Sequence, residues 1–153
     1  MRITKVTTKT GDDGKTSLGD GQRIIKNHPI INALGDLDHL NSIIGWAEVA
    51  SSNKIYSQEL KNIQQDIFNI SGDISLPESD TALLSIDRID YLEEKIKEMS
   101  NDLPPLKEFI LPRGSEFNSR LHIARTTCRN SERSLVAMHQ KQERNDFHAK
   151  YLN

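Results

Sequence analysis

The chain has 153 residues, of which 35% are hydrophobic and 27% charged, and its formal net charge is −2. This length suits one domain with one hydrophobic core, and the balanced charge excludes a disordered acidic chain and the strongly basic surface of most nucleic-acid-binding proteins. The single cysteine, Cys128, excludes an internal disulfide framework and a cysteine-rich zinc site. No apolar run approaches the roughly 20 residues of a membrane span, and the first residues lack the apolar core of a signal peptide. We therefore expect a cytoplasmic protein without membrane or nucleic-acid partners.

Residues 1–28 differ in composition from the rest of the chain. Residues 1–9 are rich in threonine, valine and isoleucine, which suits a strand or an extended arm. Residues 10–21 contain four glycines and three aspartates, a composition that predicts a long loop. Such a loop suits an anion-binding backbone nest, but a flexible loop without a ligand would have the same composition. Hydroxyl and ammonium groups accompany the glycines at Thr8, Thr10, Thr16, Ser17, Lys9, Lys15 and Lys26.

From Pro29 onward, apolar residues recur at three- and four-residue steps, which predicts helices. Pro29 suits a first helical turn, and Ser85 and Ser115 are the predicted N-caps of the third and fourth helices. The predicted helical stretches are residues 29–47, 60–74, 85–99 and 115–138, and a fifth helix is predicted to begin near Asn145. These patterns predict an all-α fold, an antiparallel bundle of four or five helices. We interpret 1–153 as a single domain, with an N-terminal loop at 1–28 and the bundle at 29–153.

The fourth predicted helix carries Arg125, Arg129 and Arg133 at intervals of four residues, which places them on one face. Three guanidinium groups in a row suit a polyphosphate, because each can bind two oxygen anions. A solvated basic face explains the same pattern, as does a polyanion binder, although the net charge and the scarcity of aromatic residues argue against nucleic acid. The glycine-rich loop in the same chain favours the anion site.

Other polar and aromatic residues give weaker signals. Asp38 and Asn41 lie one turn apart on the polar face of the first predicted helix, where Asp38 can pair with an arginine of the fourth helix or of another subunit. Cys128 falls at a core position, which predicts a small buried hydrophobic side chain. Trp46 and Phe68 are interpreted as core residues. No histidine has metal-ligand spacing, so no metal site is predicted, and three are interpreted as surface residues: His28, His139 and His148.

Four sequence blocks follow one another along the chain: Thr8-Lys9-Thr10-Gly11-Asp12 with Gly14 and Thr16; Gly35-Asp36-Leu37-Asp38-His39-Leu40-Asn41-Ser42; Phe109-Ile110-Leu111-Pro112-Arg113-Gly114-Ser115; and Leu121-His122-Ile123-Ala124-Arg125-Thr126 with Arg129, Glu132 and Arg133. Together they closely resemble the ATP:cob(I)alamin adenosyltransferases of the propanediol-utilisation type, over essentially the whole chain. The resemblance implies a five-helix bundle that forms a homotrimer with active sites between subunits. It also implies transfer of the 5′-deoxyadenosyl group of ATP to cob(I)alamin, with Mg²⁺, to give adenosylcobalamin and triphosphate. Because cobalt(I) would be the nucleophile, the protein would position the substrates and neutralise charge.

The resemblance implies roles for individual residues. The ATP-binding residues of the family match Thr8, Lys9, Thr10, Gly11, Thr16, Ser17 and Lys26 near the N-terminus, Arg129, Glu132 and Arg133 in the fourth helix, and Asn153 at the end of the chain. A salt bridge between subunits matches Asp38 with Arg125, and these two residues and Arg129 are the implied catalytic residues. The aromatic residue that closes the lower face of the corrin and excludes its lower ligand matches Phe109.

Two departures from the family pattern lead to further expectations. The family's Pro-Gly-Gly after the corrin aromatic is Pro112-Arg113-Gly114 here, which predicts an altered loop if glycine is needed there for a positive φ. The last family motif normally continues beyond Asn153 into a long closing helix. We therefore expect a shortened bundle with an exposed apolar groove, and the alternative function is a non-catalytic trimer that binds ATP or cobalamin. A cobalamin-dependent enzyme that accepts the product is an expected partner.

Overall fold

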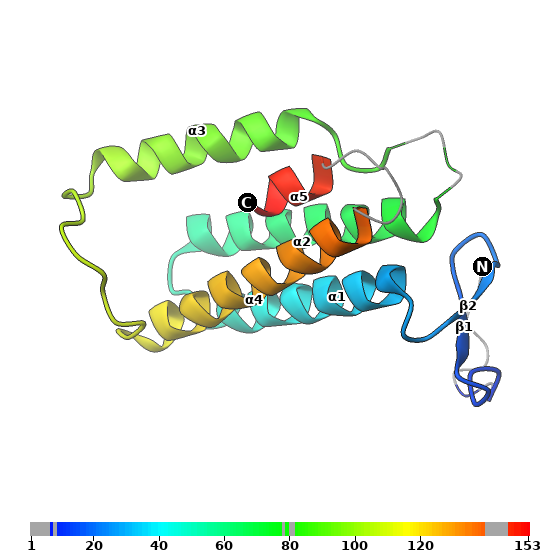
Figure 1. The fold of residues 1–153 in the computed structure, drawn as a ribbon. Helices are drawn as coiled ribbons and strands as arrows, with labels where there is room; N and C mark the ends of the chain where they lie inside the picture. The colour runs from blue at the N-terminus through cyan, green and yellow to red at the C-terminus, as the bar shows by residue number, and fades with distance from the viewer. Residues whose placement is uncertain (1–6, 8, 78, 80–81, 140–146) are drawn as a thin grey trace.

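The computed structural model describes residues 7, 9–77, 79, 82–139 and 147–153 (Figure 1). Within these residues the chain forms five helices and one two-stranded sheet. The elements are β1 (Lys15–Ser17), β2 (Arg23–Ile25), α1 (Pro29–Glu48), α2 (Lys54–Ser75), α3 (Asp87–Asn101), α4 (Glu116–His139) and α5 (Phe147–Leu152). None of the described helices combines the length and the apolar character needed to span a membrane. The predicted helical fold is confirmed.

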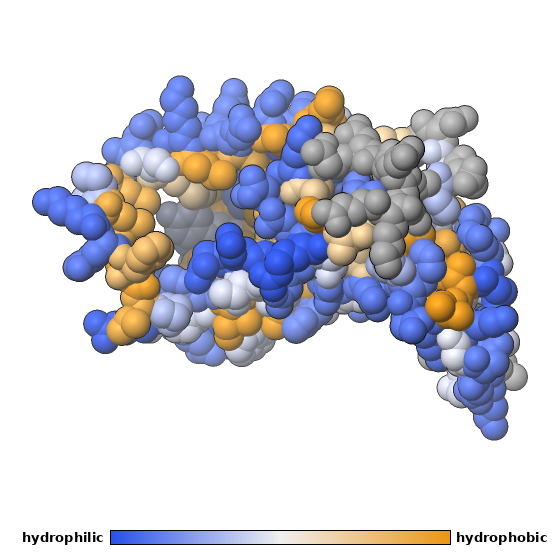
Figure 2. Space-filling view, in the orientation of Figure 1, coloured by the Kyte–Doolittle hydropathy of each residue, from blue (hydrophilic) through white to orange (hydrophobic). Residues whose placement is uncertain are grey.

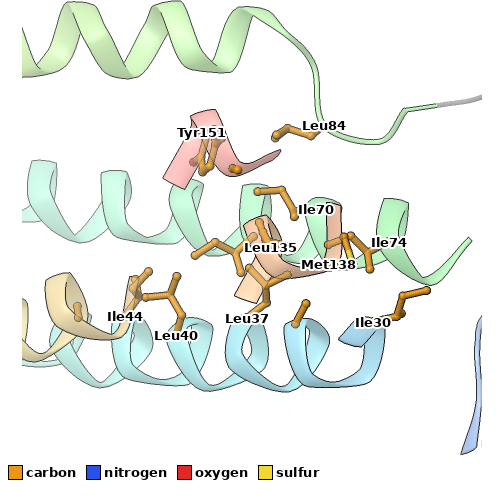
Figure 3. Close-up of a cluster of buried hydrophobic side chains, with 14 of the residues drawn as sticks. Ile30, Leu37, Leu40, Ile44, Ile70, Ile74, Leu84, Leu135, Met138 and Tyr151 are labelled. Carbon is orange, nitrogen blue, oxygen red and sulfur yellow. The ribbon is translucent and has the colours of Figure 1, made fainter. Parts of the chain in front are cut away.

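The bundle is built around α1, which packs against both α2 and α4. Figure 1 shows that α1 runs antiparallel to these two helices and that α3 lies beyond α2, while α5 packs against α4 and α3. Figure 3 shows buried side chains converging from α1, α2, α4 and α5, among them Leu37, Leu40, Ile70 and Leu135. In contrast, α3 contributes no buried residue. Polar contacts therefore matter more for the position of α3 than for that of α1.

Capping residues set where α1, α2 and α4 begin. Pro29 occupies the first turn of α1, as predicted. The Asn53 Oδ1 accepts a hydrogen bond from the Ile55 N–H at 2.8 Å, so α2 begins earlier than its apolar stripe suggests. At the start of α4, the Ser115 Oγ accepts a hydrogen bond from the Asn118 N–H at 3.2 Å, which confirms the predicted cap.

The predicted cap at Ser85 is wrong. Its hydroxyl donates to the Asp87 carboxylate instead of accepting from a backbone N–H, and α3 begins at Asp87 with Ile86 at the cap position. The side chain of Asp87 thus competes with the backbone for the serine hydroxyl. The fifth helix begins at Phe147, whereas Asn145, near which it was predicted to begin, lies outside the described residues.

Part of residues 10–21, predicted to be a loop, forms a β-hairpin in which β1 pairs antiparallel with β2. Gly21, with a φ of 87°, supplies the left-handed backbone of the connecting turn. The Leu18 side chain is buried in the core, and the Gly19 N–H donates to the Ser75 carbonyl at 2.9 Å. These contacts attach the hairpin to the end of α2, and Figure 1 shows it projecting beyond the bundle. The glycines correctly excluded a helix but did not reveal the short strand between them.

Several side chains differ in burial from the prediction. Trp46 and Phe68 are 46% and 67% exposed instead of buried in the core, because each lies beside the buried stripe of its helix and not on it. His139 is buried, which also contradicts its assignment to the surface. His148 is half-buried, and its Nε2 lies 3.1 Å from the Asp73 carboxylate.

Two further residues take structural roles. His28 is half-buried, and its Nδ1 accepts a hydrogen bond from the Ile30 N–H at 3.3 Å at the start of α1, so it is a capping residue and not a surface histidine. Cys128 packs against the hydrophobic core, and its thiol donates to the Leu152 carbonyl at 3.3 Å. Burial raises the pKa of this thiol, so it remains protonated at neutral pH. The prediction of a small core side chain at Cys128 is confirmed.

Candidate functional site

The outward face of α4 carries Arg125, Arg129 and Arg133, all of them exposed. The inward face is attached to α1, because the buried Ser131 hydroxyl donates to the Asp36 carbonyl at 2.9 Å. Among the described residues, neither Arg125 nor Arg129 forms an ion pair. Figure 2 shows a strongly hydrophilic surface over α4. A well-anchored helix thus presents guanidinium groups that can bind an anionic ligand.

A pocket of about 690 Å³ lies where the segment between α3 and α4 faces the first half of α4. It is lined by Leu106, Lys107, Glu108, Phe109, Ile110, His122 and Arg125. Phe109 is fully exposed within the chain, so its ring is available to a large apolar ligand. The structure therefore brings Phe109, expected at the corrin, onto one pocket with Arg125, expected at the catalytic centre.

The segment after Phe109 accommodates its arginine without backbone strain. Gly114 takes a positive φ of 144°, while Arg113 does not. Lys9 is the one non-glycine residue with a positive φ in the described part of the chain. The concern that Arg113 replaces a glycine needed for its backbone is therefore not supported by this geometry.

The N-terminal segment brings several predicted ATP-binding residues together around Gly11. A Cβ atom at Gly11 would lie 3.0 Å from the Lys26 Nζ, so the missing side chain lets this ammonium group approach the backbone. Lys9 has a φ of 59°, which turns the chain just before Gly11, and both Lys9 and Thr10 are exposed. Thr8 lies outside the described residues. A turned backbone beside ammonium groups suits a phosphate group.

The charge of one acidic residue of this segment, Asp13, is partly neutralised. Asp13 accepts a hydrogen bond from the Lys15 N–H at 3.0 Å and pairs with the Arg23 guanidinium at 3.1 Å. The hydrogen bond from Lys15, followed by the charge of Arg23, lowers the pKa of the Asp13 carboxyl. Thr16 is half-buried and Ser17 exposed in β1, where both are positioned by pairing with β2. The hairpin therefore presents its hydroxyl groups on an ordered backbone.

The hairpin and the arginine face of α4 lie apart within one chain. Figure 1 shows the hairpin beyond the end of the bundle at which α1 begins, whereas Arg129 lies midway along α4. Among the described residues, no hydrogen bond or ion pair joins a residue of the hairpin to a residue of α4. Asp38 and Arg125 are likewise both exposed, and no ion pair joins them within the described chain. Within the described residues, one copy of the chain therefore does not bring the hairpin, Asp38 and the arginines of α4 into one site.

The end of the chain does meet α4. Asn153 directly follows Leu152, whose carbonyl accepts the hydrogen bond from the Cys128 thiol. Arg129 and Glu132 follow Cys128 on the same helix, within about one turn. Three of the predicted ATP-binding residues are thus brought to one region of α4.

An apolar pocket of about 270 Å³ opens beside this region. Its lining combines Arg125 and Cys128 of α4 with side chains from the other four helices. Figure 2 shows the molecule hollowed between α3 and α4. This pocket gives the described chain an open, mostly apolar surface next to Arg125.

Sequence reasoning assigned no role to three polar residues that the structure places in or around the bundle. His122 lines the larger pocket one turn before Arg125, a helical spacing that was a usable signal. Asp36 accepts hydrogen bonds from α4, and Asp66 is buried on the apolar stripe of α2, where a carboxylate is unusual. In the described part of the chain, no group of three or more His, Cys, Asp or Glu residues is arranged to hold a metal ion.

Comparison with known proteins shows what this arrangement is similar to. The sequence profile of the family described as cobalamin adenosyltransferase matches residues 6–153. A cobalamin adenosyltransferase from Cupriavidus metallidurans is 39% identical, and the match covers 99% of this chain and 82% of that protein. The corrinoid adenosyltransferase PduO of Citrobacter freundii is 41% identical, and the match covers 86% of this chain and 40% of that protein. Among solved structures, a phenylalanine-to-alanine variant of a PduO-type ATP:corrinoid adenosyltransferase from Lactobacillus reuteri, complexed with cobalamin and ATP, has a TM-score of 0.91 and 33% identity, covering 97% of this chain and 86% of that one. The chain belongs to the cobalamin adenosyltransferase family.

Proposed function

We propose that this protein is an ATP:cob(I)alamin adenosyltransferase. The cobalt(I) ion attacks the 5′ carbon of ATP, so a cobalt–carbon bond forms while the bond from that carbon to the triphosphate oxygen breaks. Triphosphate leaves with the bonding electrons, and adenosylcobalamin is the product. The observation that carries the proposal is the pocket shared by Phe109 and Arg125 in a chain of this family. It joins an apolar ring with a cation, which are the two surfaces that a corrin and a polyphosphate require.

We assign ATP binding to two groups of residues. The N-terminal group consists of Thr8, Lys9, Thr10, Gly11, Thr16, Ser17 and Lys26, and the helical group of Arg129, Glu132, Arg133 and Asn153. The arginines neutralise the charge that develops on the departing triphosphate, and preorganised charges of this kind lower a reaction barrier more than charges that must first move into place. Mg²⁺ would arrive with ATP, because the triphosphate oxygens are the hard ligands that this ion prefers.

We assign the lower face of the corrin to Phe109. An exposed aromatic ring can cover the axial side of cobalt without coordinating it, so the lower ligand is excluded and cobalt(II) becomes easier to reduce. The full exposure of Phe109 and its place on the larger pocket support this role. Arg125 and Asp38 complete the set of proposed catalytic residues together with Arg129.

We further propose that the active sites lie between the subunits of a homotrimer. Asp38 of one subunit would pair with the partner subunit's Arg125, since both side chains are exposed in one chain. The hairpin of one subunit would likewise meet the arginine face of the next, because it projects away from its own α4 (Figure 1). We place the reaction, carried out by a single domain, in the cytoplasm, with a cobalamin-dependent enzyme as the partner that accepts the product.

An anoxic assay tests the proposed reaction. The protein is mixed with ATP, Mg²⁺ and chemically reduced cobalamin, and the visible spectrum follows the loss of cob(I)alamin and the gain of adenosylcobalamin. Product formation above the control without protein is expected. Binding of ATP or cobalamin without turnover would instead favour the alternative, a non-catalytic binding trimer, for which the open apolar pocket beside Arg125 is the supporting observation.

A further inference from the structure

A buried carboxylate on α2 connects three helices. Asp66 is 6% exposed, and its carboxylate accepts hydrogen bonds from the Arg88 guanidinium of α3 at 2.7 and 2.9 Å. The same carboxylate accepts a hydrogen bond from the Tyr151 hydroxyl of α5 at 2.7 Å. Burial of the Tyr151 phenol, followed by its hydrogen bond to Asp66, raises its pKa, so the hydroxyl remains a donor at neutral pH. Asp66 is therefore the point at which α2, α3 and α5 meet.

This cluster is not explained by stability alone. A carboxylate on an apolar stripe pays a desolvation penalty, and well-packed apolar residues in place of a buried ion pair are often equally or more stable. Hydrogen bonds constrain the relative position of two helices more than apolar contacts do, because donor and acceptor must meet within a narrow range of distance and angle. The cluster of Asp66, Arg88 and Tyr151 thus determines where α5 lies along α2 and α3.

The helix that it positions is too short to position itself. α5 has six residues, and an isolated helix of this length is not stable in water. Ala149 and Tyr151 of α5 are buried, and Phe147 and Leu152 pack against the core while partly exposed. These apolar contacts have no preferred direction, so they fix the register of the helix less sharply than a hydrogen bond does. The carbonyl of Leu152 then accepts the thiol hydrogen of Cys128, which ties the end of α5 to α4. Asn153 is the next residue, exposed beside that contact.

We propose that Asp66 and Tyr151 are positioning residues for ATP: their hydrogen bond fixes α5 on α2, so that the Leu152 carbonyl reaches Cys128 of α4 and Asn153 lies in register with Arg129 and Glu132. This inference rests on the proposed function, because it uses the assignment of Asn153 to ATP. It adds residues that do not touch the nucleotide and that determine how tightly it is held. Loss of the hydrogen bond should therefore weaken ATP binding and leave the larger pocket unaffected, because that pocket is lined by no residue of α2 or α5.

The chain offers a matched control for the Tyr151 hydroxyl. Tyr91 of α3 donates its hydroxyl to the Glu59 carboxylate of α2 at 2.7 Å, so it also links a tyrosine to a carboxylate of α2. This bond does not involve α5. Tyr91→Phe and Tyr151→Phe thus remove the same atom from the same kind of bond, and only the second change reaches the end of the chain.

The experiment measures steady-state kinetics, ATP affinity by calorimetry and melting temperature for the wild type and both variants. We expect Tyr151→Phe to raise the KM and the dissociation constant for ATP about tenfold, with the KM for cobalamin unchanged, and Tyr91→Phe to change each by less than about twofold. An unchanged ATP affinity in Tyr151→Phe, an equal loss in both variants, or a loss confined to cobalamin would overturn the inference. If the wild type binds ATP but makes no adenosylcobalamin, the proposed function fails while the calorimetric comparison still decides the positioning role; a wild type that binds no ATP overturns both.

Two substitutions at Asp66 supply an independent check. Asp66→Asn retains an oxygen that can accept the Tyr151 hydrogen, whereas Asp66→Leu fills the site without an acceptor. We expect the ATP affinity of Asp66→Asn to stay closer to that of the wild type, and that of Asp66→Leu to fall as in Tyr151→Phe. The reverse order, or equal affinities in these two variants, would contradict a role that acts through this hydrogen bond.

Discussion

The arginine face of α4 and the N-terminal hairpin both carry proposed ATP-binding residues, but they are built in different ways. α4 is a long helix whose inward face is buried against α1, so it presents side chains from a backbone that is held in place. The hairpin has two strands of three residues and is attached to the bundle through Leu18 and Gly19. There the candidate site depends on the backbone at Gly11 as well as on side chains, because the missing Cβ of Gly11 gives the Lys26 ammonium group its place. Substitutions that remove a charge should therefore reduce activity most on α4. Substitutions that add a side-chain atom at a glycine should reduce it most next to the hairpin.

The largest effect is expected from removing a charge on α4. Arg129→Ala should lower kcat/KM about 100-fold, because one of the cations facing the departing triphosphate is lost. Its melting temperature should change little, since the side chain is exposed and forms no ion pair among the described residues. Lys97→Ala removes a cation from the exposed surface of α3 and serves as the control. Equal activity in the two variants would remove Arg129 from the proposed site.

The second change adds one methyl group at Gly11, just before the hairpin. Gly11→Ala places a Cβ 3.0 Å from the Lys26 Nζ, so the ammonium group must move, and we expect the KM for ATP to rise about tenfold. Lys26→Ala should cause a similar loss. The double variant should be no worse than either single one, because both changes act on the same contact. Fully additive losses would show that Gly11 acts independently of Lys26.

A mixture of two impaired variants, assayed at an ATP concentration well below the KM of Gly11→Ala, tests whether the two regions meet between subunits. In trimers assembled from equal amounts of Gly11→Ala and Arg129→Ala chains, about one quarter of the sites between subunits combine an intact hairpin with an intact α4. Activity should therefore return to about one quarter of the wild-type value after co-expression. If each site lies within one chain, the mixture will show only the average of the two variants.

The smallest effect concerns the contact between α4 and the end of the chain. The pKa of the Cys128 thiol is raised by burial, so on unfolding the thiol loses its proton more readily than in the folded protein. Its contribution to stability is complete below the pKa of the unfolded thiol, about 8.5, and declines as the pH rises from there toward the folded value. Between pH 8 and 10 the melting temperature of the wild type should fall faster than that of Cys128→Ala, by less than about 3 °C. If the melting temperatures of both proteins fell equally with pH over this range, the effect would be contradicted.

The sequence predicted the helices best where their apolar stripes were long. Leu37, Leu40, Ile70 and Leu135 are buried as their spacing required, and Ser115 caps α4 as expected. The predicted cap at Ser85 and the predicted loop across Lys15–Ser17 were wrong, because a neighbouring carboxylate binds the Ser85 hydroxyl and a partner strand pairs with Lys15–Ser17. Local propensity is weak wherever a nearby side chain or a second strand supplies an alternative hydrogen bond.

For the candidate site, the helical spacing of the arginines placed them on one exposed face, and the structure brings Arg125 and Phe109 onto one pocket. Helical spacing also places His122 one turn before Arg125, but the pocket that these residues line with Phe109 depends on how the segment before α4 folds back. Trp46, Phe68 and His139 were assigned to the wrong environments for a related reason. Neighbouring residues of a helix point to different sides, so moving one position along the sequence can move a side chain from the core to the surface. Residue type alone does not determine on which side a residue lies.

The sequence by itself determined the class of fold, the cationic face of α4 and the family, because these depend on spacing along one helix and on the order of local blocks. Only the tertiary structure decided that the hairpin stands apart from that face and that Asp66 joins Arg88 to Tyr151. Such contacts link residues that are distant in the chain, and their geometry follows from how whole helices pack. No local pattern specifies that packing, because the free energy of burying each apolar stripe depends on all the others at once.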